Sequence, residues 1–370
     1  MALTAIKMYN IIMINSYKYG GGGSFMELTK KQVSITKGVA ILFMLFLHLF
    51  CTKDYQGLFT PLIMIKGVPL VYYLALFGDC CVAIYCFCSG YGLMCTYKNN
   101  PDEYNKKNAK RILKLYINFW IIILLFVVLL GYLTGNSATY PGNIKTFLLN
   151  VTAISVSYNG AWWFLTTYII LVAFSKFINK IIQKYNNILI TLIVFVIYCI
   201  CYVQRIKVII TFTNPVLNWA ITQTALLGTS LFPFVVGAIF ADKKIYSFIY
   251  NKVNNINFKN TLCILGILFM IVCHGFVQTL FVAVFIGIAF IVLFNLIDKP
   301  DSLDRLLYYL SGHSTNMWLT HMFFYMVYFK SLVFMPKYPV LIFIWLVILC
   351  LVSSSLIKYI YNCIMNIFNL

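Results

Sequence analysis

The sequence predicts an all-α polytopic membrane protein with about ten transmembrane helices. The chain has 370 residues, of which 62% are hydrophobic and only 10% are charged, whereas soluble domains carry roughly 25% charged residues. A soluble fold cannot bury so much apolar surface, so the long apolar runs are expected to cross a bilayer as helices. The formal net charge of +19 fits this class, because basic residues hold cytoplasmic loops against the inner leaflet. We therefore expect membrane lipid as a partner and no nucleic acid.

Ten apolar segments account for the expected helices in chain order. Each is compatible with a crossing of the hydrocarbon core, although the seventh is short, which leaves open a link to the eighth inside the membrane. The expected spans are residues 34–52, 69–96, 114–133, 161–181, 187–204, 215–240, 260–275, 277–297, 312–334 and 338–362.

The loops between these segments predict the orientation. Most lysines and arginines fall on one side of the expected bundle. The other side receives only Lys53, Lys66, Lys145, Arg205, Lys207, Lys330 and Lys337. This asymmetry follows the positive-inside rule if both termini lie in the cytoplasm. The expected location is therefore a plasma membrane, crossed several times with an even number of spans.

The first 25 residues do not fit the pattern of the expected membrane domain. Four glycines and a serine at residues 20–24 resemble an engineered linker or a translated ribosome-binding site, since glycine codons are purine-rich. No secretory signal pattern is present. We expect residues 1–25 to be a non-native or wrongly assigned, disordered leader. The natural start is then Met26, and residues 26–370 form a single membrane domain.

Cysteine is frequent but gives no sign of a metal site. The 12 cysteines include no CxxC pair, and none stands at zinc-type spacing from a histidine. Most lie within apolar runs, where a small soft side chain suits helix packing. We therefore expect no bound metal.

The most informative pair is Lys37 and His48 in the first apolar segment. Eleven positions separate them, close to three helical turns, so both side chains lie on one face about 16 Å apart along the axis. The lysine falls at the expected cytoplasmic rim. The histidine falls well inside the membrane, where an ionisable side chain is costly and is by default a functional candidate. Histidine is suited to move a proton near neutral pH, and a purely structural hydrogen bond within the bundle is the alternative.

The second segment carries candidates at both ends. Near its cytoplasmic end, Ser89-Gly90-Tyr91-Gly92 allows close backbone approach, and the serine can bond to the backbone or to a ligand. A tight helix crossing without a ligand is the alternative. Asp79, at the outer end, is placed to orient a histidine or a sugar hydroxyl, or is simply solvated.

Basic residues precede the third span. Arg111 and Lys114 are three positions apart and so share a helix face. Such a pair at the cytoplasmic rim suits a phosphate-bearing donor, and an ordinary positive-inside anchor is the alternative.

Two later segments add further candidates. Trp163, at the outer start of the fourth span, belongs to an interfacial aromatic belt or forms a stacking platform for a sugar ring. His321 lies inside the ninth span, eight residues after His313 and on nearly the same helix face, and a structural hydrogen bond is its alternative role. His274 is interpreted as structural.

Taken together, these segments resemble the bacterial membrane acyltransferase-3 family, whose members O-acylate sugars and peptidoglycan. The family's first-span pattern of arginine, ten residues and histidine is similar to Lys37 through His48, with lysine in place of arginine. Its Phe-x-x-Ser-Gly-Phe pattern is similar to residues 86–91, with both outer aromatic positions altered. The basic pair before the third span resembles Arg111 and Lys114, again with one lysine for arginine.

The later family motifs continue the resemblance in the same order. The tryptophan-aromatic-leucine motif looks like residues 163–165, and the late glycine, serine and histidine motif looks like Gly312, Ser314 and His321. The resemblance covers about residues 28–365. Each motif is short, but five in this order on a ten-span plan are fairly specific.

The resemblance implies a membrane O-acyltransferase in a bacterial cytoplasmic membrane. It would transfer an acyl group, expected to be acetyl, from cytoplasmic acyl-CoA to a hydroxyl of a surface, capsular or exopolysaccharide glycan or of its lipid-linked precursor. Acyl-CoA, expected to be acetyl-CoA, would then be a co-substrate, with no tightly bound cofactor. His48 would be the catalytic base or a covalent acyl relay. The implied donor-binding residues are Lys37, Ser89, Arg111 and Lys114, and the implied supporting residues are Asp79, Trp163 and His321.

Two other functions compete with this interpretation. A transporter or glycan flippase needs a polar path, and intramembrane acids are scarce here. A polysaccharide polymerase would need a large outer loop, but the longest expected outer loop, about residues 134–160, is short and carries only Lys145 among basic residues. Both therefore rank below the acyltransferase.

Overall fold

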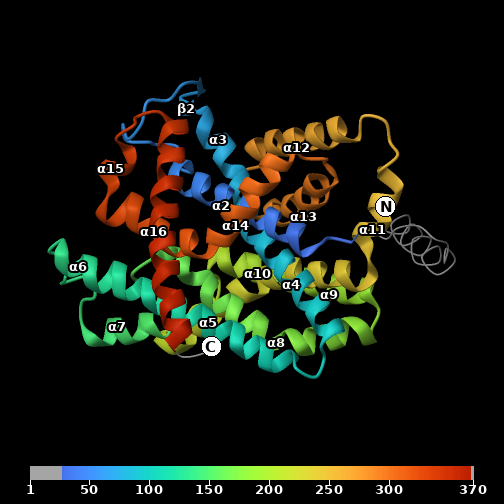
Figure 1. The fold of residues 1–370 in the computed structure, drawn as a ribbon, viewed down its shortest axis with the longest axis horizontal. Helices are drawn as coiled ribbons and strands as arrows, with labels where there is room; N and C mark the ends of the chain where they lie inside the picture. Colours follow the sequence, from blue (N-terminus) through green and yellow to red (C-terminus); the bar gives the residue numbers. More distant parts are fainter. Residues whose placement is uncertain (1–26, 368–370) are drawn as a thin grey trace.

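The computed structural model describes residues 27–367, which are helical apart from loops and one small hairpin (Figure 1). The leader and the start at Met26 that we expected lie outside the described residues. The long helices are α2 (Lys30–Phe50), α4 (Cys81–Asn99), α5 (Tyr104–Ile122), α8 (Trp163–Lys184), α9 (Asn187–Lys207), α10 (Pro215–Lys243), α12 (Lys259–Phe276), α13 (Leu280–Leu296), α14 (Asp301–Met322) and α16 (Pro339–Ile367). The shorter elements are the hairpin strands β1 (Met64–Ile65) and β2 (Val68–Pro69), and α3 (Leu70–Leu76), η1 (Phe77–Cys80), η2 (Ile123–Leu129), α6 (Leu130–Leu133), α7 (Ile144–Val151), η3 (Gly160–Trp162), α11 (Ile245–Val253), η4 (Phe323–Tyr328) and α15 (Lys330–Phe334).

Each expected span coincides with one long helix, alone or together with one or two short helical elements. In the described part of the chain, eight helical segments are long and apolar enough to cross a membrane: Lys30–Phe50, Leu70–Asn99, Tyr104–Leu133, Gly160–Lys184, Asn187–Lys207, Pro215–Lys243, Lys259–Phe276 and Pro339–Ile367. The eighth expected span is α13, which is apolar but shorter. The ninth is α14, whose first turns carry Asp301, Asp304 and Arg305. The protein is therefore an all-α polytopic membrane protein, as predicted.

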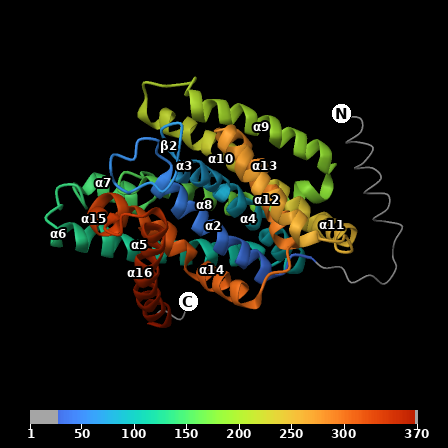
Figure 2. The same ribbon diagram turned by 90° about the horizontal axis from the view of Figure 1, so that it is seen from above.

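The short elements gather at two opposite ends of the bundle. One end, here called the basic side, carries α11 and the turn between α13 and α14, and the other carries β2, α6, α7 and α15 (Figures 1 and 2). Glu27 joins two elements of the basic side by accepting hydrogen bonds from Tyr91 at 2.8 Å and Ser247 at 2.6 Å. At the other end, the Trp219 indole donates to the carbonyl of Ile154 at 2.9 Å. The cytoplasmic location of the basic side stays a prediction from the charge pattern.

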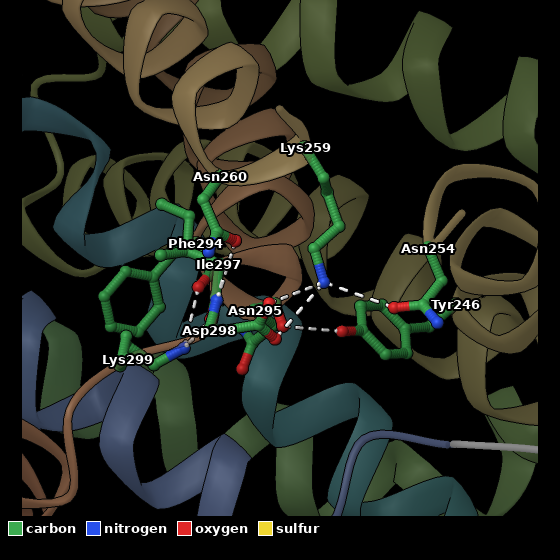
Figure 3. Close-up of polar contacts among 9 residues, drawn as sticks. All are labelled: Tyr246, Asn254, Lys259, Asn260, Phe294, Asn295, Ile297, Asp298 and Lys299. Carbon is green, nitrogen blue, oxygen red and sulfur yellow. Dashed lines mark hydrogen bonds and ion pairs between the residues drawn. The ribbon is translucent and has the colours of Figure 1, made fainter. Parts of the chain in front are cut away.

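A polar cluster joins the helix ends on the basic side (Figure 3). Lys259, at the start of α12, is buried, and its ammonium lies 3.0 Å from the Asp298 carboxylate and 3.2 Å from the amide oxygen of Asn254. The Tyr246 hydroxyl donates to the carbonyl of Asn295 at 2.8 Å. Because a buried ammonium is costly unless it is paired, these contacts hold α11, α12 and the end of α13 together.

Helix α2 lies in the middle of the bundle in both views, packed against α4 and α14 (Figures 1 and 2). It runs parallel to α14, since Gly38 lies against Leu307 and, further along, His48 reaches His321. A Cβ at Gly38 would overlap with the carbonyl oxygen of Leu307. Glycine at this position therefore permits the close approach that brings the two histidines together.

A second close crossing joins α4 to α10 at Gly90. A Cβ on Gly90 would overlap with the carbonyl oxygen of Phe234, whereas a Cβ on Gly92 would meet nothing within 4 Å. The expected close backbone approach in this segment is therefore confirmed at Gly90 but not at Gly92.

Candidate active site

A cavity of about 550 Å³ lies beside α2 and is enclosed by residues of α4, α5, α8, α9, α10, α13 and α14 as well. This volume falls within the roughly 300–1,000 Å³ that is usual for small-molecule sites. Six of the residues singled out from the sequence line it: Lys37, His48, Asp79, Ser89, Arg111 and Trp163. The tertiary structure therefore unites candidates that come from four separate segments of the chain.

Two histidines meet at the wall of this cavity. The Nδ1 atom of His48 lies 2.6 Å from Nε2 of His321. His48 is partly exposed to the cavity, whereas His321 is completely buried behind it. Both residues are candidates from the sequence, but only the packing of α2 against α14 shows that they touch.

The hydrogen bonds of this pair assign its protons. Nδ1 of His321 lies 2.7 Å from the carbonyl oxygen of Trp318, which can only accept, so this nitrogen carries a hydrogen. In the neutral ring, Nε2 of His321 is then an acceptor, and Nδ1 of His48 donates to it. Nε2 of His48 consequently keeps its lone pair, and no hydrogen bond to a described residue occupies it. A cavity-lining imidazole in this tautomer is a base or a nucleophile.

Two cations enter the same cavity from near the starts of α2 and α5. Nη1 of Arg111 donates to the amide oxygen of Asn108 at 2.8 Å. In the described chain, no carboxylate forms an ion pair with either Lys37 or Arg111. Two cavity-lining cations without a carboxylate partner favour an anionic ligand.

Ser89 uses its hydroxyl within its own helix. The Ser89 hydroxyl donates to the carbonyl of Tyr85 at 2.7 Å, and the Tyr85 hydroxyl donates to the carbonyl of Lys37 at 3.1 Å. Of the two roles considered from the sequence, the structure thus shows a bond to the backbone. The Ser89 oxygen, which lines the cavity, can still accept a hydrogen bond.

Asp79 orients a histidine, but the partner is His274. An oxygen of Asp79 lies 3.4 Å from Nε2 of His274, which is only 1% exposed. Asp79 also lines the cavity, so its carboxylate is shared between this buried histidine and the site. Asp79 therefore does not take the place next to His48 that His321 occupies.

Trp163 lines the cavity together with Arg205, which the charge pattern of the sequence places in an outer loop. The Arg205 guanidinium lies 4.6 Å from the centre of the Trp163 ring, and its Nη1 donates to the Thr229 hydroxyl at 3.2 Å. Arg205 lines the same cavity. Its sequence position could have marked it as a candidate site residue. Arg205 falls within the last turn of an apolar helix, where a charged side chain is near the edge of the membrane and is costly.

Lys114 does not line the main cavity. It lines a neighbouring cavity of about 440 Å³ together with Lys358, from the far end of the chain. Leu115 and Thr315 line both cavities, so the two adjoin. Arg111 and Lys114, which the spacing places on one helix face, thus line two different but adjoining cavities. Lys358 is a second basic cavity residue, after Arg205, that the sequence did not indicate.

The fold and this cavity define a polytopic membrane protein with a histidine pair and unpaired cations at an internal site. The chain belongs to the acyltransferase-3 family, because that family's model, described as an acyltransferase domain, matches residues 31–360. The protein is therefore a membrane acyltransferase, which confirms the resemblance inferred from the motifs. No curated protein and no solved structure matches the chain.

Proposed function

We propose that this acyltransferase moves an acyl group, expected to be acetyl, from acyl-CoA to a hydroxyl of a glycan or its lipid-linked precursor. In this proposal the protein lies in a bacterial plasma membrane with its basic side toward the cytoplasm, where acyl-CoA is made. The observation that carries the proposal is the free Nε2 lone pair of His48 in a cavity that Lys37 and Arg111 make cationic.

The histidine pair supports one balanced transfer step. Nε2 of His48 takes the proton of the acceptor hydroxyl as its oxygen attacks the thioester carbonyl carbon. The carbon–sulfur bond then breaks, and the imidazolium returns the proton to the leaving thiolate, giving an ester and free CoA. His321 accepts from Nδ1 of His48 throughout and so keeps Nε2 as the basic nitrogen. In the alternative acyl-relay route, Nε2 itself attacks the thioester carbonyl carbon, and the carbon–sulfur bond breaks to release the CoA thiolate. The acceptor hydroxyl then attacks the acyl-imidazole, the carbon–nitrogen bond breaks to restore His48, and the hydroxyl proton passes to the thiolate.

The positions of the cationic side chains are compatible with the phosphate groups of an acyl-CoA donor. Lys37 and Arg111 lie near the helix starts on the basic side, where diphosphate oxygens would enter. The adjoining cavity with Lys114 and Lys358 adds two more cations along the same route. The thin pantetheine arm is then left to run along α2 toward His48, over the 16 Å or so that eleven helical residues span.

The test of this proposal is transfer of label from radiolabelled acetyl-CoA to glycan in membranes that contain the protein. We expect label in the glycan fraction only when the protein is present, and its release by mild alkali, as for an ester. Membranes from the same cells without the protein are the control. Absence of acyl-CoA-dependent labelling, together with substrate-dependent flux in vesicles free of acyl-CoA, would contradict the proposal and favour the transporter alternative.

Replacing Arg111 should weaken donor binding selectively. We expect Arg111→Gln to raise KM for acetyl-CoA about tenfold to a hundredfold, since a charge-assisted hydrogen bond is worth roughly 1.5–3 kcal/mol, while kcat changes little. Lys110→Gln is the matched control, because Lys110 is an exposed neighbour that lines neither cavity. Equal KM values for the two variants would refute a donor role for Arg111.

His321 should act as a positioning residue for His48. We expect His321→Leu to lower kcat by roughly 10²-fold with KM nearly unchanged, because Nδ1 of His48 loses its acceptor and the productive tautomer is no longer selected. His321→Gln should restore much of the rate, since its amide oxygen can accept the same hydrogen bond. A glutamine variant as slow as the leucine variant, with both proteins equally stable, would argue that His321 serves packing alone.

A further inference from the structure

Arg205 projects into the cavity from the end of α9, whereas the donor cations Lys37 and Arg111 sit near the starts of their helices. The carbon at the centre of its guanidinium lies 4.6 Å from the centre of the Trp163 ring, and its Nη1 donates to the Thr229 hydroxyl at 3.2 Å. The hydrogen bond uses one nitrogen of the group. The remaining N–H groups of the fork are left for another partner.

No carboxylate of the described chain forms an ion pair with Arg205. The acid that lines the cavity, Asp79, lies 3.4 Å from His274. An arginine within a membrane span is costly, and such residues pair with an acid, a carbonyl or a ligand. The cavity wall therefore holds three cations, Lys37, Arg111 and Arg205, and one acid, Asp79, so that positive charge is in excess.

The donor accounts for only part of this positive charge. Its phosphates belong with the two cations nearest the basic side, and its acyl end belongs at His48. Arg205 comes instead from the last turn of α9 and lies over Trp163, the first residue of α8. Ser230, which follows Thr229 in α10, also lines the cavity. It is only 2% exposed, and its hydroxyl has no hydrogen-bond partner among the described residues. A cation and a hydroxyl on the wall of one cavity are suited to an anionic sugar.

We infer that Arg205 binds an acid group of the acceptor, so that the acceptor is an acidic glycan that carries a carboxylate or phosphate close to the acylated hydroxyl. This inference rests on the proposed function. The guanidinium forms charge-assisted hydrogen bonds to the acid group and thereby places the neighbouring hydroxyl toward His48. A neutral sugar leaves Arg205 without its anion and binds more weakly.

The test uses three probes that differ only at carbon 6 of the sugar: methyl β-glucuronide, methyl β-glucoside and methyl β-glucoside 6-phosphate. Each competes with the membrane's own glycan for label from radiolabelled acetyl-CoA, in membranes that contain the full-length protein. We expect the two charged probes to inhibit at concentrations at least tenfold below that of the neutral one. Arg205→Gln should abolish this preference, and Arg205→Lys should retain part of it. Lys207→Gln, which removes a nearby exposed charge that does not line the cavity, should leave the preference unchanged.

Several outcomes would overturn the inference. These are equal inhibition by the three probes, no inhibition by any of them, a charge preference that survives Arg205→Gln, or one that Lys207→Gln abolishes equally. If Arg205→Gln instead changes only the choice between succinyl-CoA and acetyl-CoA, the anion belongs to the acyl group and the acidic acceptor is refuted. Labelling of the membrane's own glycan by the wild-type protein is measured in the same samples. Its presence keeps a failure of this inference separate from a failure of the acyl-CoA reaction.

Discussion

Replacement of His48 by alanine should abolish acyl transfer while the protein still inserts into the membrane. We expect a loss of about 10³-fold or more in kcat/KM, because the variant lacks the only cavity-lining imidazole among the described residues and with it the general base or relay. The measurement is label transferred from radiolabelled acetyl-CoA to glycan, normalised to the amount of membrane-inserted protein.

A glutamine variant distinguishes a chemical role of His48 from a packing role. His48→Gln keeps a donor for Nε2 of His321 but has no basic nitrogen, so we expect it to be as inactive as the alanine variant. The control is His313→Asn. His313 is also a buried histidine of α14, but its ring bonds to Ser354 at 2.9 Å and does not line the cavity, so activity should be retained. Normal acetylation by His48→Gln would rule out both base and relay.

Adding a single methyl group at Gly90 should destabilise the bundle strongly. Gly90→Ala places a Cβ where the carbonyl oxygen of Phe234 lies, so α4 and α10 must move apart. We expect a loss of about 1–3 kcal/mol or more in the free energy of unfolding, as for other overpacked contacts. A lowered midpoint of thermal unfolding in detergent, followed by size-exclusion chromatography of the tagged protein, is the readout. Activity should fall as well, because both helices line the cavity.

The matched control lies two residues further along the same helix. Gly92→Ala adds the same methyl group where no atom lies within 4 Å, so its effect should stay within about 1 kcal/mol and favour the helix. Similar unfolding midpoints for the two variants would mean that the α4–α10 crossing relaxes freely and that Gly90 is not required for it.

The positions of the membrane helices follow from the sequence because they depend on local properties. A run of about 20 apolar residues must be helical in lipid whatever its neighbours are, since its backbone polar groups have no other partners. The shared face of Lys37 and His48 is equally local, because it follows from the helical repeat, and both residues do line the cavity. The hydropathy evidence for a membrane crossing is weaker for two helices. Helix α13 is short, and α14 carries charged residues in its first turns.

The composition of the site depends on contacts between distant segments. The sequence places His321 inside a span but does not show what it contacts. It reaches His48 because Gly38 lets α14 approach α2 closely. The same packing assigns His274 to Asp79 and His313 to Ser354.

The cavities that Arg205 and Lys114 line could not be predicted from the sequence. The membrane class, the succession of helices, the family and six residues of the main cavity could be predicted from the sequence, because hydropathy, helical period and motif order are local properties of the chain. The packing of the helices was needed to show that Arg205 lines the main cavity, that Lys114 lines its neighbour, and that Nε2 of His48 keeps its lone pair. The physical reason is that helix crossings, set by small residues and side-chain packing, determine which faces of the helices meet.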